Sequence, residues 1–145
     1  HTLSFRALTV IDTVTNFPEV IRINSKKASH VGEQFSNAWL SRYPRPMRCI
    51  VDPGTEFKGD FTQVLRNYGI KRVPTTVKNP QANAICERLH RTVADALRTL
   101  TLAHPCQTRN DAQQLLDTAL QTAAYSMRSA IHGNLGISPG ALVFH

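Results

Sequence analysis

The spacing of hydrophobic residues changes along this chain from that of a strand to that of a helix, which restricts the fold to a mixed α/β type. Residues 5–13 and 17–23 are rich in β-branched and aromatic side chains, and residues 14–16 between them can form a short turn. From Ser25 to about Tyr43 the apolar residues recur every three or four positions. We therefore predict a hairpin followed by a helix, with Ser25 as its N-cap.

The rest of the chain continues to alternate between strand patterns and helix patterns. Short apolar runs predict strands over residues 47–52 and 70–74, and the helix between them is followed by Gly69 at the C′ position. A long helix is predicted from Asn79-Pro80 to about residue 104, and another over residues 110–129. The order β-β-α-β-α-β-α-α favours helices packed on a mixed sheet.

Length and charge limit the possible functions. The chain has 145 residues, enough for one domain, and a formal net charge of +7, which favours a polyanionic partner. It has no apolar run of about 20 residues and no signal peptide, so we expect an intracellular protein, nuclear or cytoplasmic, without a membrane partner. Its three cysteines form no disulfide or zinc pattern. Because the first residue is His rather than Met, we expect residues 1–145 to be a fragment of a longer polypeptide.

Two carboxylates stand where α/β folds place their chemistry. Asp52 ends a predicted strand, and Asp52-Pro53-Gly54-Thr55 has the Pro and Gly of a type II turn. Glu87 lies about 200° around the long helix from the apolar Ile85, on a polar face shared with Asn83, His90 and Arg91. That face suits a phosphate backbone near a metal ion. It also suits an ordinary solvated helix in which Glu87 and Arg91 form an i, i+4 pair.

Four segments resemble one known family. Residues 51–57 (VDPGTEF) and 79–92 (NPQANAICERLHRT) resemble the T-D-N-G-x-E-F and H-P-Q-x-N-G-x-x-E-R-x-(N/H)-R-T motifs of the retroviral and gypsy-type LTR-retrotransposon integrase core. Residues 69–71 (GIK) and 132–144 resemble two further family segments, and all four stand in the family's order.

The resemblance implies a ribonuclease H-like fold and a polynucleotidyl transferase that depends on Mg²⁺ or Mn²⁺. Three carboxylates of such an enzyme hold two metal ions, water trims the 3′ end of the element's DNA, and the new 3′-hydroxyl attacks target DNA. By this match Asp52 is the second carboxylate and Glu87 the third, both catalytic and metal-binding. The DNA-binding candidates are Lys78, Gln81, Asn83, Arg88 and Arg91. Element-end DNA, target DNA and further copies of the full-length protein are the implied partners.

Asp12 does not match the first carboxylate of the family. Residues 10–17 resemble the family's I-D-x-x-(T/S) segment, which follows the strand that bears the first catalytic Asp. We expect Asp12 to close the hairpin turn. We expect the first Asp on a central strand upstream of His1, and therefore a fragment that is poorly stable and inactive alone.

Three departures from the family motifs leave other functions open. Pro53 replaces the usual Asn, Asn79 the usual His, and Ala84 the usual Gly. The alternatives to an active integrase core are a non-catalytic remnant that binds DNA and a DDE transposase.

Overall fold

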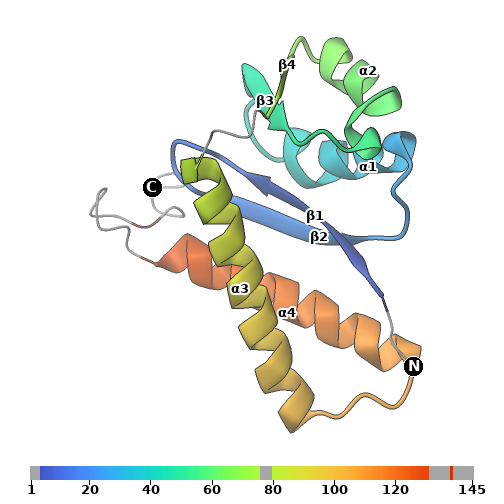
Figure 1. Cartoon of the computed structure of the whole chain (residues 1–145), viewed down its shortest axis with the longest axis vertical. Coiled ribbons are helices and arrows are strands. Elements are labelled where there is room, and N and C mark those ends of the chain that lie inside the picture. Colours follow the sequence, from blue (N-terminus) through green and yellow to red (C-terminus); the bar gives the residue numbers. More distant parts are fainter. Residues whose placement is uncertain (1–3, 76–79, 131–137, 139–145) are drawn as a thin grey trace. The chain divides into compact units, whose positions relative to one another are not determined.

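The chain folds into two compact units, each of which is described by itself. The computed structural model describes residues 4–75, 80–130 and 138, without the side chains of residues 80–83. One unit combines residues 1–22 with residues 81–145, and the other is residues 23–80 (Figure 1). Within the described ranges no helix is both long enough and apolar enough to cross a membrane.

The first unit contains a hairpin and two long helices. Strands β1 (Arg6–Ile11) and β2 (Pro18–Ile23) pair, and the Asp12 N–H donates to the Phe17 carbonyl at 3.0 Å across the turn. Helices α3 (Pro80–Ala103) and α4 (Arg109–Ser129) supply most of the core. Buried side chains cluster in this core at Val20, Leu89, Leu120, Ala123 and Ala124.

Helix α4 begins with a capping box that the sequence analysis missed. The Thr108 hydroxyl accepts from the Asp111 N–H, and the Asp111 carboxylate accepts from the Thr108 N–H. Two N–H groups of the first turn are satisfied in this way. The sequence pattern predicted a helix start at residue 110, whereas α4 begins at Arg109. The T-x-x-D spacing of Thr108 and Asp111 is the sequence feature that identifies this start.

The second unit is built on a parallel strand pair. Strands β3 (Arg48–Val51) and β4 (Lys71–Pro74) pair with Arg48 opposite Lys71 and Val51 opposite Pro74. Helices α1 (Ala28–Phe35) and α2 (Asp60–Asn67) lie beside the pair in Figure 1. Phe35 and Phe61 join them, with ring centroids 5.5 Å apart. Parallel strands need such a crossover, and α2 provides it.

Most predicted elements are confirmed, and the start of the first helix is corrected. The hairpin, both later strands, the two long helices and the C′ role of Gly69 (φ 67°) agree with the prediction. Ser25 is not the N-cap: its hydroxyl accepts from the Lys27 N–H at 3.1 Å, and Lys27 occupies the N-cap position without a side-chain hydrogen bond to the helix. The helix therefore starts two residues later than predicted. Its last part, Ser36–Leu40, is a π-helix η1.

The strands form two pairs rather than one continuous sheet. Among the described residues β1 has only β2 as a neighbour, and β3 has only β4. The family resemblance predicts a central strand that joins both pairs, and no described residue supplies it. Each pair therefore keeps an edge without a strand partner in the described part of the chain.

Candidate functional site

Asp52 directly follows β3, at the carboxyl end of the parallel strand pair, and its side chain is exposed. Its Oδ1 atom accepts from the Gly54 N–H at 2.8 Å. The Oδ2 atom has no protein partner in the described ranges, so one oxygen holds the loop and the other remains open to a ligand.

The predicted type II turn is wrong. Gly54 has φ −63° and ψ 150°, extended backbone angles that do not themselves require glycine, instead of the positive φ that such a turn requires. The cause is the Asp52 carboxylate, which accepts from the backbone two residues on as in an Asx turn. The chain then enters the 3₁₀-helix η2 (Thr55–Phe57).

Glu56 is a second carboxylate in this loop, and the sequence analysis did not select it. Its carboxylate folds back over Gly54 so closely that a Cβ atom on Gly54 would overlap it. The sequence feature that could have identified Glu56 is its place four positions after Asp52, in the D-P-G-T-E segment. The loop after β3 thus brings two carboxylates to Gly54, one to its N–H and the other against its Cα.

Glu87 is exposed on α3, and the buried Leu89 points in a different direction from the same helix. This confirms the exposed face predicted from the helical period. Glu87 and Arg91 form no ion pair with one another in the structure, although they are four residues apart. Both charges are therefore available to a ligand.

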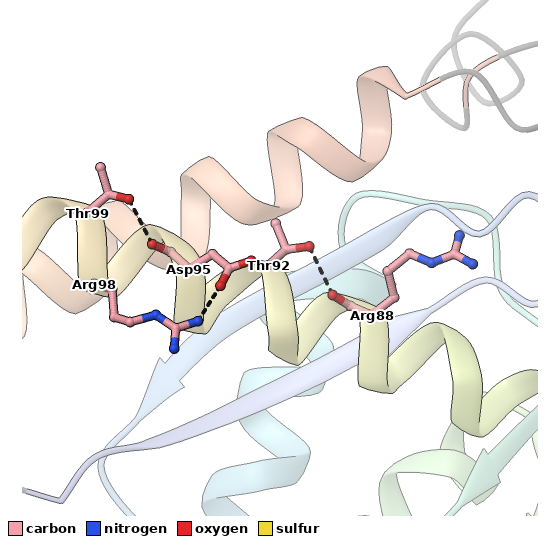
Figure 2. Close-up of polar contacts among 5 residues, drawn as sticks. All are labelled: Arg88, Thr92, Asp95, Arg98 and Thr99. Carbon is pink, nitrogen blue, oxygen red and sulfur yellow. Dashed lines mark hydrogen bonds and ion pairs between the residues drawn. The ribbon is translucent and has the colours of Figure 1, made fainter.

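The arginines of α3 differ in whether their charge is already neutralised. Figure 2 shows Arg98 paired with Asp95, while the guanidinium of Arg88 reaches no other labelled residue. Thr92 and Thr99 donate to the carbonyls of Arg88 and Asp95 at 2.9 and 3.0 Å, so their hydroxyls serve the helix itself. Arg88 and Arg91 remain DNA-binding candidates, and Arg98 is a natural control.

The other predicted DNA-binding residues lie beyond what the structure describes. Lys78 is outside the described residues, and Gln81 and Asn83 fall in the first turns of α3, where side chains are not described. Asp52 and Glu87 belong to different units. Over the described residues no group of three His, Cys, Asp or Glu side chains is placed to hold a metal ion.

Asp12 has the turn-closing role that was predicted for it. Its Oδ2 atom accepts from the Thr15 hydroxyl at 2.6 Å, and its Oδ1 atom accepts from the Val14 N–H at 3.3 Å. Because both oxygens already bind the turn, Asp12 is a poor candidate for a metal ligand.

Cys49 and Cys86 are not activated nucleophiles. Burial raises the pKa of Cys49 to about 11, although the nearby Arg72 opposes the shift. Burial also raises the pKa of Cys86, which precedes Glu87. A raised pKa keeps a thiol protonated and unreactive at neutral pH.

Helix α3 also borders a hollow that the sequence analysis missed. An open hollow of about 790 Å³ is lined mostly by apolar side chains of β1, α3 and α4, with His90 among its polar residues. Its apolar walls bring β1, near the start of the chain, together with the much later helices α3 and α4, and no local pattern reveals this combination.

Comparison with known proteins supports the resemblance. No protein-family model matches the chain. The chain is 29% identical over 94 residues to the retrovirus-related Pol polyprotein from transposon 412 of Drosophila melanogaster. The matched residues are 64% of this chain but only 8% of that polyprotein.

Two solved structures share the fold. The catalytic core domain of BIV integrase matches with a TM-score of 0.73 and 21% identity over 96% of this chain and 85% of that one. The second structure is a chain of the simian T-cell lymphotropic virus intasome, solved in complex with the PP2A regulatory subunit B56 gamma. It matches with a TM-score of 0.76 and 14% identity, and the match covers 97% of this chain and 49% of that one. The chain has the fold of a retroviral integrase catalytic core, and its sequence resembles a retroelement polyprotein.

Proposed function

We propose that this chain is the core of a retroelement integrase, a polynucleotidyl transferase that trims the 3′ ends of the element's DNA and joins them to target DNA. The observation that carries the proposal is the position of Asp52. It directly follows β3 of the parallel strand pair, with one carboxylate oxygen free of protein partners among the described residues. The chain that carries it matches an integrase core over 96% of its length.

Asp52 and Glu87 are the proposed metal-binding and catalytic residues. Both are exposed carboxylates that no cation of the described residues neutralises, and Mg²⁺ and Mn²⁺ favour oxygen ligands of this kind. When bound, such ions supply charge stabilisation at the phosphorus and activation of the attacking oxygen. The hydrogen bond from the Gly54 N–H orients the Asp52 carboxylate before any ligand arrives.

Arg88 and Arg91 are the proposed contacts to the DNA backbone near Glu87. Both are exposed, and neither forms an ion pair within the described residues, whereas Arg98 on the same helix is bound to Asp95. Lys78, Gln81 and Asn83 are proposed for the same role from the sequence match alone. A likeness to a chain of an intasome supports action as a homo-oligomer on DNA.

The third carboxylate is proposed to lie on a strand that is not part of residues 1–145. Asp12 binds its own turn with both oxygens, and β1 and β3 each have only one strand neighbour among the described residues. A strand that pairs with both would complete the sheet and add the missing ligand. This chain alone is therefore proposed to be inactive.

The test uses the complete parent protein with a labelled duplex of the element's end, a target plasmid and Mg²⁺. We expect 3′-end trimming and strand transfer in the unaltered protein, and no detectable product from Asp52→Asn or Glu87→Gln. Arg98→Gln is the control and retains both activities. Activity that survives Asp52→Asn would overturn the assignment.

The same test decides between the alternatives. Retained DNA binding with no product from the unaltered protein would support a non-catalytic remnant. Excision of the element from flanking DNA, in place of joining of free ends, would support a DDE transposase.

A further inference from the structure

The positive charge of this chain is concentrated in one of its two units. Residues 23–80 contain ten Lys and Arg against four Asp and Glu, a net charge of +6. The other unit contains seven against six, a net charge of +1. The polyanion affinity expected from composition therefore resides mainly outside the unit that contains α3 and its DNA-binding candidates.

Four exposed cations of the second unit gather where the two parallel strands begin. Arg48 and Lys71 are the first residues of β3 and β4 and stand opposite one another in the register. Parallel strands lie about 4.8 Å apart, so these two side chains start from neighbouring positions. The Lys71 N–H donates to the Met47 carbonyl at 3.0 Å, which fastens the segment before β3 to the start of β4.

Arg45, in the loop before β3, and Arg66, in the last turn of α2, complete the cluster. The Arg45 Nη1 atom donates to the carbonyls of Tyr68 and Gly69 at 3.0 and 3.2 Å, and the Gly69 N–H donates to the Arg66 carbonyl at 3.0 Å. Arg45 is thus held by neutral acceptors that leave its charge in place. We call this surface the basic end, and it consists of Arg45, Arg48, Arg66 and Lys71.

No acidic residue offsets the basic end locally. The sequence has no Asp or Glu over residues 34–51 or 61–80, and none of the four cations forms an ion pair within the described residues. Like charges held at close range repel one another, and a bound polyanion relieves that repulsion.

Two exposed side chains indicate which polyanion fits. Tyr68 is 44% exposed and Met47 is 83% exposed, and both belong to the segments that carry the cations. Cations beside an exposed aromatic ring suit a ligand with both phosphates and bases better than an acidic protein surface. The shared chemistry is the phosphate backbone of a nucleic acid, single-stranded or duplex.

The basic end is distinct from the candidate catalytic edge. Arg48 begins β3 and Asp52 follows its last residue, a separation of about 13 Å along the strand at ~3.3 Å per residue. A nucleic acid on the basic end therefore contacts the protein beyond the position of Asp52. We propose that the basic end is a second nucleic-acid contact, separate from the α3 candidates. It does not depend on the chain being catalytic.

The test compares binding of the complete parent protein to labelled duplex and single-stranded oligonucleotides by fluorescence anisotropy at several salt concentrations. The main variant is Arg48→Gln with Lys71→Gln, because neither side chain makes a hydrogen bond in the described residues. We expect affinity to fall about tenfold or more at ~0.1 M salt. The slope of log affinity against log salt should fall by about 1.8 for duplex or about 1.4 for a single strand.

Three controls keep the result interpretable. Arg98→Gln removes an exposed arginine that is already paired and should leave affinity unchanged. Arg48→Lys with Lys71→Arg keeps both charges and should retain affinity, and circular dichroism should show that every variant is folded. Tyr68→Ala distinguishes the two ligands. If affinity falls about fivefold or more for the single-stranded oligonucleotide alone, the ligand is a single strand whose bases stack on Tyr68. If affinity does not fall, the ligand is duplex.

Failure of this inference and failure of the proposed function are distinguishable. If the Arg48→Gln, Lys71→Gln variant binds both oligonucleotides with unchanged affinity and salt slope, the inference is overturned even where Asp52→Asn abolishes strand transfer. If that variant loses affinity for the oligonucleotides while Asp52→Asn keeps strand-transfer activity, the basic end is supported as a nucleic-acid contact and the catalytic role of Asp52 is overturned.

Discussion

Arg128 and Glu19 form an ion pair across the first unit, with 2.9 Å between Nη2 and Oε1, in which the Glu19 side chain is only 8% exposed. The same guanidinium donates to the Pro18 carbonyl from Nε and Nη2 at 3.0 and 2.8 Å and lies 4.7 Å from the centroid of the Phe17 ring. One arginine near the end of α4 therefore fastens the helix to the start of β2 and neutralises a buried carboxylate.

Replacing Arg128 should destabilise the protein strongly. Arg128→Met keeps much of the side-chain volume but leaves the buried Glu19 carboxylate without this partner, which should lower the free energy of unfolding by about 3 kcal/mol. Urea denaturation measures the change. Adding Glu19→Gln should recover part of the loss, because a neutral amide is less costly to bury. A single variant as stable as the unaltered protein would show that the ion pair contributes little.

The contribution of the α4 capping box to the free energy of unfolding should be measurable with a single substitution. Thr108→Ala removes the hydroxyl that accepts from the Asp111 N–H, and such a loss lowers the free energy of unfolding by about 1 kcal/mol. Thr118→Ala, at an exposed position within the same helix, is the matched control and should be neutral or slightly stabilising. Equal effects of the two substitutions in thermal unfolding would argue against the cap.

Local rules predicted those elements whose causes lie within a few residues. The hairpin follows from two β-branched runs, and Gly69 takes φ 67° because the C′ position after a helix favours the left-handed region. The exposure of Glu87 follows from the helical period alone. The type II turn at Gly54 failed because a side chain competes with the backbone there, and the Asp52 carboxylate decides the geometry.

The remaining features depend on contacts between distant segments. The basic end needs the register that sets Arg48 opposite Lys71 and the reach of Arg45 to Gly69. No periodicity shows either contact. The candidate site was predicted mainly through family resemblance, since a lone Asp at a strand end and a Glu on a helix have many ordinary explanations. Asp12 is the exception, because its turn role follows from the residues next to it.

Asp12 should be dispensable for catalysis in the complete parent protein. Asp12→Asn keeps an acceptor for the Val14 N–H and loses only the charged acceptor for Thr15, so we expect a destabilisation of at most about 1 kcal/mol. Strand transfer should remain within a few fold of the unaltered protein, whereas Asp52→Asn should abolish it. If Asp12→Asn also removed all activity from a protein that is still folded, Asp12 would be a catalytic ligand.

Cys49 should make stability fall at high pH. The folded state keeps this thiol protonated up to a pKa of about 11, whereas an unfolded chain releases the proton near its ordinary pKa of about 8.5. Between these values the folded state binds more protons than the unfolded state, so the free energy of unfolding decreases as pH rises. Below about pH 8 the thiol is protonated in both states and contributes no slope.

The measurement is urea denaturation of the unaltered protein and of Cys49→Ala from pH 7 to pH 10.5. The variant should be less stable at neutral pH, because it leaves a small void. The difference between the two proteins should then shrink with rising pH by up to about 3 kcal/mol, since only the unaltered protein carries the Cys49 linkage. Cys106→Ala removes an exposed thiol and should follow the unaltered protein throughout. Parallel curves for the unaltered protein and Cys49→Ala would mean that the Cys49 thiol ionises equally in both states, and that burial in β3 does not keep its proton in place.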